Sequence, residues 1–174
     1  MPLLQAVQRN GDLWNADRVR QDFTDSEREL FKQSPHAEVD DILLRFPDRD
    51  SPTISDDLIC TNQPALARLP QARPLIFGLM NQVDGMLLGR VMITRLRPGK
   101  RITPHADTRG LYANSMQRYH VVLQGEPGAM FVAEDEQVNM RTGEVWQFNA
   151  HAMHECMNNS TDDRVHLIID IRSE

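Results

Sequence analysis

The stretch GEVWQFNAHAMHECMNNSTDDRVHLIID, residues 143–170, alternates short β-type runs with turn residues. The runs are residues 144–148, 155–158 and 165–171, with turn signals at Thr142-Gly143 and Asn158-Asn159-Ser160. Short runs of apolar residues bounded by Gly, Asn and Ser are typical of strands in all-β proteins. The stretch therefore predicts successive strands, of which a His opens the second and an Arg opens the third.

The same pattern extends toward the N-terminus as far as Met86. Further β-type runs are residues 86–96, 116–123, 129–132 and 137–140, with turn signals at 98–99 and 125–128. Many short strands separated by turns at this spacing indicate a sandwich or jelly roll. We predict a mainly β (α+β) protein with a jelly-roll core and N-terminal helices packed on one outer face.

The N-terminal sequence predicts mostly helices. Residues 15–33 are loosely helical, contain the capping-box pair Thr24 and Glu27, and are followed by Ser34-Pro35, which ends the run. We interpret them as a surface helix pair or one broken helix. Residues 74–83 form a second candidate helix, and residues 39–46 an apolar run that we interpret as a short strand.

The length of 174 residues is that of one domain. We expect a single domain over residues 1–174, with a mostly helical portion at 1–85 and a jelly-roll core at 86–174 that carries the functional site.

Composition excludes several classes of protein. The net charge of -6 gives no general reason to bind nucleic acid or an anionic membrane. Neither the N-terminus nor any other stretch has the apolar run of a signal peptide or a membrane span. Only Cys60 and Cys156 are present, which favours reduced thiols in a cytoplasmic protein over a disulfide framework.

The tripeptide His105-Ala106-Asp107 is the first candidate for a metal site. In an extended chain residues i and i+2 lie on one face, so the imidazole and the carboxylate would point the same way. A third ligand would come from a distant strand, and the candidates are His120, His151, His154 and His166. Two histidines and one carboxylate on one side of a metal suit a non-haem Fe(II) that also binds a co-substrate and O₂.

Among these histidines the strand pattern favours His154 over His151. His154, Cys156 and Asn158 alternate along one predicted strand, whereas His151 lies in the preceding loop. Cys156 would then point toward the pocket wall as a small buried hydrophobe. For His36, in Ser-Pro-His-Ala-Glu, we expect a solvent-exposed or capping role.

Arg164 opens the last predicted strand and indicates an acidic ligand. A guanidinium inside a barrel has to be paired, and its planar fork matches a carboxylate. 2-Oxoglutarate meets this requirement, with its keto acid end on the iron and its far carboxylate on the arginine.

Several stretches between residues 89 and 171 resemble the aspartyl/asparaginyl β-hydroxylase family of Fe(II)/2-oxoglutarate-dependent dioxygenases. They are Gly-Arg at 89–90, Arg-Leu-Arg-Pro-Gly at 95–99, Ile-Thr-Pro-His-Ala-Asp at 102–107, Arg-Tyr-His at 118–120, Gly-Glu-Val-Trp-Gln-Phe at 143–148, and residues 154–170. The resemblance implies a double-stranded β-helix core, which is a cupin-like jelly roll and agrees with the strand pattern.

The resemblance also implies roles for individual residues. His105 and His154 match the two metal-binding histidines, and Arg164 matches the residue that pairs with the far carboxylate of 2-oxoglutarate. Arg118 and His120 match a second pair that lines the same pocket. Asp107 is by chemistry the natural third metal ligand, whereas some relatives in the family use two histidines alone.

Strand phase supports this allocation independently. Arg118 and His120 share one face of their strand, and Arg164 and His166 share one face of theirs. We expect these polar faces to point into the barrel and the aliphatic faces to pack under the helices. Further candidates for the pocket wall are Trp146, Cys156, Asn158 and His166.

The function that we predict is hydroxylation of an unactivated C–H bond with O₂ and 2-oxoglutarate, releasing succinate and CO₂. No catalytic residue is expected beyond the metal centre, and the substrate would be an amino acid, another small metabolite or an Asp/Asn side chain. We favour a small molecule, because no peptide-binding repeat is visible. The alternative is a cupin-type metal-binding protein with a non-oxygenase activity or a ligand-sensing role, in which Arg164 would have no purpose. A plain interaction scaffold would require structural histidines.

Overall fold

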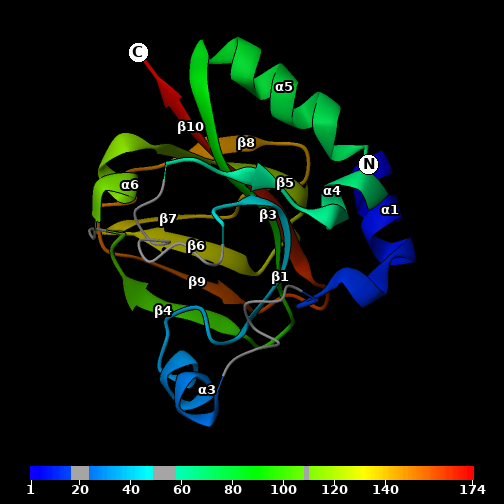
Figure 1. Cartoon of the computed structure of the whole chain (residues 1–174). Helices are drawn as coiled ribbons and strands as arrows, with labels where there is room; N and C mark the ends of the chain where they lie inside the picture. The colour runs from blue at the N-terminus through cyan, green and yellow to red at the C-terminus, as the bar shows by residue number, and fades with distance from the viewer. Residues whose placement is uncertain (17–23, 49–57, 108–109) are drawn as a thin grey trace.

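The computed structural model describes residues 1–16, 24–48, 58–107 and 110–174, and these form two antiparallel β-sheets with helices around them (Figure 1). The larger sheet has the order β2 (Thr61–Asn62), β1 (Val39–Phe46), β3 (Gly85–Leu96), β10 (Arg164–Ser173), β5 (Gln117–Gln124), β8 (Val145–Gln147). The smaller sheet has the order β4 (Arg101–His105), β9 (His154–Asn158), β6 (Ala129–Ala133), β7 (Glu136–Val138).

From β3 onward the chain passes repeatedly from one sheet to the other. Strands β3, β5, β8 and β10 lie in the larger sheet, and β4, β6, β7 and β9 in the smaller one. Each sheet therefore pairs strands that are distant in sequence, such as β3 with β10 and β4 with β9. This is the connectivity of a jelly roll, and the predicted fold class is confirmed.

Helices α1 (Pro2–Arg9), α4 (Pro64–Arg68) and α5 (Ala72–Gln82) cover the outer face of the larger sheet (Figure 1). Their buried side chains, among them Leu3, Leu66 and Ile76, join one apolar cluster with Ile93, Val121, Leu167 and Ile169 of the sheet. The prediction that N-terminal helices pack on one outer face is confirmed, although of these three helices only α5 was itself predicted.

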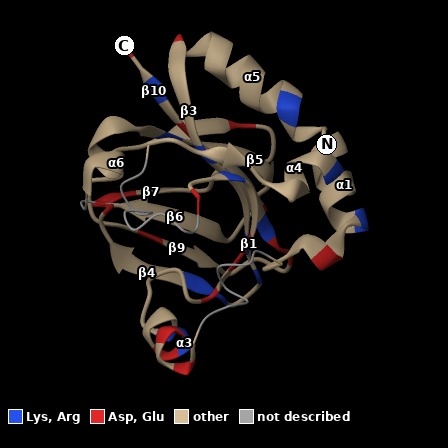
Figure 2. Ribbon diagram, viewed as in Figure 1, with Lys and Arg blue, Asp and Glu red and all other residues tan. Residues whose placement is uncertain are grey.

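Helix α3 (Asp25–Lys32) lies elsewhere, beyond β4 at the other end of the molecule (Figure 1). No residue of this helix is buried, and Figure 2 shows acidic residues gathered on it. It is stabilised locally by the predicted capping box, in which the Glu27 backbone N–H donates to Thr24 Oγ1 and the Thr24 N–H donates to Glu27 Oε2.

Several elements differ from the sequence prediction. We predicted a helix pair or one broken helix over residues 15–33; the described part of this range contains one helix, which starts at Asp25 after the capping box, and residues 17–23 lie outside the described part. The pattern did not predict α1, α4, β4 or α6 (Gly110–Ser115), because elements of five to eight residues carry a weak periodic signal. No helix among the described residues is long and apolar enough to cross a membrane.

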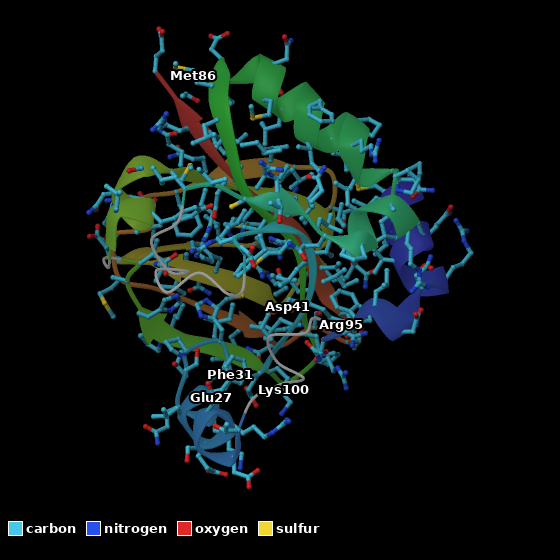
Figure 3. All side chains as sticks on the ribbon, viewed as in Figure 1. Glu27, Phe31, Asp41, Met86, Arg95 and Lys100 are labelled. Carbon is cyan, nitrogen blue, oxygen red and sulfur yellow. The ribbon has the colours of Figure 1, made fainter. Side chains whose placement is uncertain are left out.

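Arg95 attaches the N-terminal segment to the barrel (labelled in Figure 3). Its guanidinium lies 4.3 Å from the centroid of the Trp14 ring, and its Nη2 lies 2.8 Å from Oδ2 of Asp40 on β1. The cation–π contact thus holds the chain before β1 against β3, and the ion pair joins β1 to β3.

A second apolar cluster fills the space between the two sheets. Its buried members are Val39, Leu96, Val122, Phe131, Met140 and Cys156. On β5, Val122 belongs to this inner cluster, while its neighbours Val121 and Leu123 belong to the outer one. Polar residues that share a face with Val122 are therefore directed into the barrel, as strand phase predicted.

Asn158 connects the β3–β4 turn with the loop before β10. Its side chain is fully buried, and Nδ2 donates to the carbonyl oxygens of Leu96, at 2.7 Å, and Asp162, at 2.8 Å. Its Oδ1 accepts from the N–H and the hydroxyl of Ser160. Asn158, predicted as a possible pocket wall, thus has its amide engaged in fixing the loop that leads to Arg164.

We expect Asn158→Ala to lower the free energy of unfolding by about 2–4 kcal/mol. The buried Leu96 carbonyl loses its hydrogen-bond donor, and the loop before β10 loses the side-chain contacts with Asp162 and Ser160 that hold it. Asn159→Ala is the matched control, since that side chain is exposed, and should change stability by less than about 0.5 kcal/mol. Urea denaturation followed by circular dichroism measures both values. Equal stability of the two variants would show that Asn158 does not brace the loop.

Candidate metal centre and adjoining cavities

His105 and His154 face each other across the pairing of β4 with β9. His105 ends β4, His154 begins β9, and the register places them as direct partners. Their ring centroids are 4.2 Å apart. Asp107 lies just beyond the end of β4, where its backbone N–H donates to the Ala150 carbonyl oxygen at 2.8 Å. Antiparallel pairing thus brings together two histidines that are far apart in the sequence.

His105, Asp107 and His154 each offer one ligand atom, and these atoms lie within 4.8 Å of one another. In each histidine Nδ1 lies 2.9 Å from a backbone carbonyl oxygen, that of Thr103 for His105 and that of Ala152 for His154. If Nδ1 carries the proton, Nε2 keeps a free lone pair, which is the form that binds a metal.

The environment of these groups fits a divalent cation. Nε2 of His105 is buried and has no hydrogen-bond partner among the described residues, and Oδ1 of Asp107 lies 3.6 Å from it. Burial lowers the pKa of His154 and outweighs the opposing hydrogen bond to the Ala152 carbonyl, so the neutral imidazole that a metal requires is favoured. Two imidazoles and one carboxylate are a donor set suited to iron with open coordination positions.

A small inner cavity of about 90 Å³ lies between the sheets on one side of this group. Its wall includes His120, Phe131, Phe148, Cys156 and Arg164. Arg164 is buried, and no ion pair joins it to a carboxylate of the described residues. A guanidinium in such a place favours a carboxylate ligand, because a buried charge is costly unless it is paired.

A wider outer cavity of about 580 Å³ lies on the other side. Its wall includes Arg90, Tyr112 and Met116. His36, His105 and Arg118 line both cavities. The candidate metal centre therefore stands at the boundary between a small pocket and a larger opening.

Arg118 is held by two carboxylates. Its Nη1 donates to Oδ2 of Asp107 at 2.7 Å, and its Nε and Nη2 donate to the two oxygens of Asp170 at 2.8 and 3.0 Å. Burial lowers the pKa of Arg118, but Asp170 and then Asp107 outweigh it and raise the pKa overall. Arg118 thus fixes Oδ2 of Asp107, while the other carboxylate oxygen, Oδ1, is directed toward His105.

Asp170 was not among the residues that we predicted for the site. It is buried, and it also accepts a hydrogen bond at 3.0 Å from the Tyr112 hydroxyl, which in turn accepts from the backbone N–H of Arg90. Its position two residues after Ile168, on the polar face of β10, is the sequence signal that could have found it.

His36 lies beside the metal centre, and our expectation of an exposed or capping role was wrong. Its ring meets that of His105 edge to face, with centroids 4.6 Å apart. Burial first, and the nearby charge of His105 second, lower the pKa of His36 to about 4, while the charge of Asp107 opposes this shift. No pattern in the sequence indicated this, because the residue follows a Ser-Pro turn and belongs to no strand.

The other predicted residues divide into two groups. The first group lines the inner cavity together with His105 and His154, and its members are Arg118, His120, Cys156 and Arg164. Burial raises the pKa of the Cys156 thiol.

The second group consists of three predicted wall residues that are not part of that lining. Trp146 packs on the inner apolar cluster with its indole N–H donating to Glu144, His166 is buried behind His120, and Asn158 braces the loop described above. His151 is exposed in the turn before β9, so the preference for His154 agrees with their positions.

Comparison with known proteins gives a family and a curated relative. A family model described as aspartyl/asparaginyl β-hydroxylase matches residues 58–174. An L-proline cis-4-hydroxylase of Rhizobium meliloti (strain 1021) is 30% identical over 120 residues, which are 68% of this chain and 42% of that protein. The chain thus spans less than half the length of this relative, and His36 lies outside the matched family region.

Solved structures with partial similarity include cupin-type proteins. A predicted oxalate decarboxylase from Thermotoga maritima is 18% identical and covers 55% of this chain and 72% of its own, with a TM-score of 0.40. A cupin domain from Bordetella pertussis Tohama I is 20% identical and covers 48% of this chain and 81% of its own, with a TM-score of 0.38.

We expect the metal-free protein to lose stability as the pH falls from about 6.5 to about 4. In this window the unfolded chain binds a proton at residue 36 with the ordinary histidine pKa near 6.5, whereas folded His36 with its pKa of about 4 does not, so unfolding is favoured. His36→Gln should remove about 1–2 kcal/mol of the loss between pH 7.5 and pH 5.

Urea denaturation at the two pH values, with a chelator present, measures this difference. His151→Gln is the matched control, because His151 is exposed, and its pH dependence should match that of the wild type. A His36→Gln profile that also matches the wild type would contradict the buried, neutral state of His36.

Proposed function

The chain belongs to the aspartyl/asparaginyl β-hydroxylase family, and from this membership we propose that it is an Fe(II)- and 2-oxoglutarate-dependent dioxygenase. The observation that carries the proposal is the convergence of His105, Asp107 and His154 at the mouth of a cavity whose wall contains Arg164. The relative named L-proline cis-4-hydroxylase supports the hydroxylase activity.

The iron would be held by Nε2 of His105, Nε2 of His154 and Oδ1 of Asp107. Because Arg118 engages Oδ2 of Asp107 at 2.7 Å, only one oxygen of that carboxylate is left for the metal. Three protein ligands leave three positions for a co-substrate and O₂. When bound, the iron with O₂ and 2-oxoglutarate supplies the oxidant that hydroxylates an unactivated C–H bond, while 2-oxoglutarate becomes succinate and CO₂.

The inner cavity would hold 2-oxoglutarate. Arg164 would pair with the far carboxylate through its planar fork, and His120 would contact the same ligand from β5. Arg118 lines this cavity as well, but its bonds to Asp107 and Asp170 favour a role in orienting the metal ligand. Phe131 and Phe148 line the same cavity and would limit the access of water to the bound ligand.

The outer cavity would hold the substrate. The Arg90 guanidinium carbon lies 4.0 Å from the centroid of the Tyr112 ring and 5.2 Å from that of the Phe46 ring, which orients it at the cavity wall. An oriented guanidinium favours a substrate that carries a carboxylate. We therefore favour a small amino acid over an Asp/Asn side chain of a folded protein, in keeping with the named substrate of the relative.

The metal assignment predicts that the protein binds about one Fe(II), or Mn(II) as a surrogate. His105→Ala or His154→Ala should weaken binding by roughly 100-fold or more, because each removes one of three ligands. His151→Ala is the matched control, since His151 is an exposed histidine three residues from His154, and should bind as the wild type does. Anaerobic calorimetric titration measures the affinities.

Full metal affinity in both ligand variants would contradict the assignment. The variant Asp107→Ala distinguishes a three-ligand metal site from a site with two histidine ligands. A loss of metal affinity is expected for a three-ligand site, whereas unchanged affinity and activity would place the protein among relatives that use two histidines.

The co-substrate assignment predicts that Arg164→Ala weakens 2-oxoglutarate binding by about 2–4 kcal/mol, because a charge-assisted bidentate contact in a poorly hydrated pocket is lost. This is about a 30- to 1000-fold rise in dissociation constant. Arg164→Lys should recover only part of the loss, since an ammonium lacks the fork. Titration of 2-oxoglutarate into the Mn(II)-loaded variants measures it.

Arg172→Ala is the control, because Arg172 lies on the same strand with an exposed side chain. Its affinity for 2-oxoglutarate should equal that of the wild type. Equal affinities for wild type, Arg164→Lys and Arg164→Ala would remove the co-substrate assignment and favour the cupin alternative.

A further inference from the structure

A pair of buried histidines forms part of the barrel behind the inner cavity. His120 is on β5 and His166 on the neighbouring β10, where their Nδ1 atoms are 3.3 Å apart and their ring planes are nearly perpendicular, at 89°. His120 lines the cavity, whereas His166 is fully buried. None of the roles assigned above uses His166.

The surroundings of both rings favour the neutral form. Burial first, and the nearby guanidinium of Arg164 second, lower the pKa of His120 and that of His166 well below their ordinary value. A neutral imidazole carries one ring proton. The contact between the two Nδ1 atoms therefore requires that one ring has its proton on Nδ1 and that the other has it on Nε2.

The surroundings of His166 decide which ring is the donor. Its Nε2 is buried and has no hydrogen-bond partner among the residues described. If His120 donated from Nδ1, the Nδ1 of His166 would accept and its ring proton would be on Nε2. His166 would then bury an unpaired Nε2–H. If His166 donates from Nδ1, its Nε2 is a bare acceptor. Orphaned buried N–H groups are the rarer and costlier case, so the second arrangement is favoured.

The tautomer of His120 determines which of its ring nitrogens can donate a hydrogen bond in the inner cavity. With Nδ1 of His120 accepting from His166, its ring proton is on Nε2, the polar edge that is left toward the cavity. Phe148, at 5.2 Å between centroids, and Phe131, at 6.3 Å, meet this ring edge to face and limit its rotation. His120 then presents a donor near Arg164, which suits a carboxylate oxygen.

We infer that His166 is a positioning residue that holds His120 in the Nε2–H tautomer, so that His120 donates a hydrogen bond to a carboxylate of the ligand in the inner cavity. The identity of that ligand as 2-oxoglutarate rests on the proposed function. The tautomer itself depends only on contacts within the chain.

The first test needs no ligand. Long-range ¹H–¹⁵N spectra of the wild-type protein labelled at histidine distinguish the tautomers, and loss of signals in His120→Asn and His166→Asn assigns them. We expect neutral rings, with the proton on Nε2 of His120 and on Nδ1 of His166. A proton on Nδ1 of His120 would overturn the inference.

The second test connects the tautomer with binding. His166→Asn keeps an N–H donor near the position of Nδ1, and His166→Leu removes it. Titration of 2-oxoglutarate into Mn(II)-loaded protein should give a dissociation constant about fivefold to tenfold higher for His166→Leu, and within about twofold of the wild type for His166→Asn. Mn(II) affinity should be equal in all three.

Two results would overturn the inference here: a wild-type constant for His166→Leu, or equal losses for both variants. If the wild type does not bind 2-oxoglutarate at all, the proposed function fails, while the tautomer measurement still decides the role of His166.

Discussion

The two-residue periodicity of β10 is the constraint on which the rest of the molecule depends. One face of this strand carries Leu167 and Ile169, which anchor the larger sheet against α1, α4 and α5. The opposite face carries His166 and Asp170, both buried. A polar group can remain in such a place only if it is paired, since an unpaired charge in a poorly hydrated interior is costly. The pairing of Asp170 with Arg118 therefore fixes β5 against β10 and, through Arg118, the candidate ligand Asp107.

Much of this arrangement follows from the sequence, because strand phase is a local property. The alternation of Arg118 and His120 with Tyr119 and Val121 predicts which side chains enter the barrel, and the same logic places Arg164. The jelly roll itself follows from the number and spacing of short runs. The resemblance to the β-hydroxylase family added the roles of His105 and His154, whose proximity depends on a β4–β9 pairing that no local pattern encodes.

The sequence did not predict the contacts that residues make where strands end. We predicted an extended His105-Ala106-Asp107, but β4 stops at His105, and Asp107 is held by the Ala150 carbonyl and by Arg118. His36 reaches the metal centre from a turn that has no periodicity. Such contacts depend on how loops close over the barrel, and hence on distances between segments that the alternation of side chains does not specify.

The chain of hydrogen bonds from Tyr112 through Asp170 and Arg118 to Asp107 joins the wall of the outer cavity to the metal centre. Replacing Tyr112 to reshape the cavity would therefore also affect the metal centre. The substitution removes a hydrogen-bond donor from the buried Asp170 carboxylate, which orients Arg118. Substitutions at Tyr112 and at Asp107 would be epistatic, with combined effects that differ from the sum of the single ones. Evolution toward a new substrate would find Ala106 and Ala150, whose side chains line the same cavity without a polar group, easier to change than Tyr112.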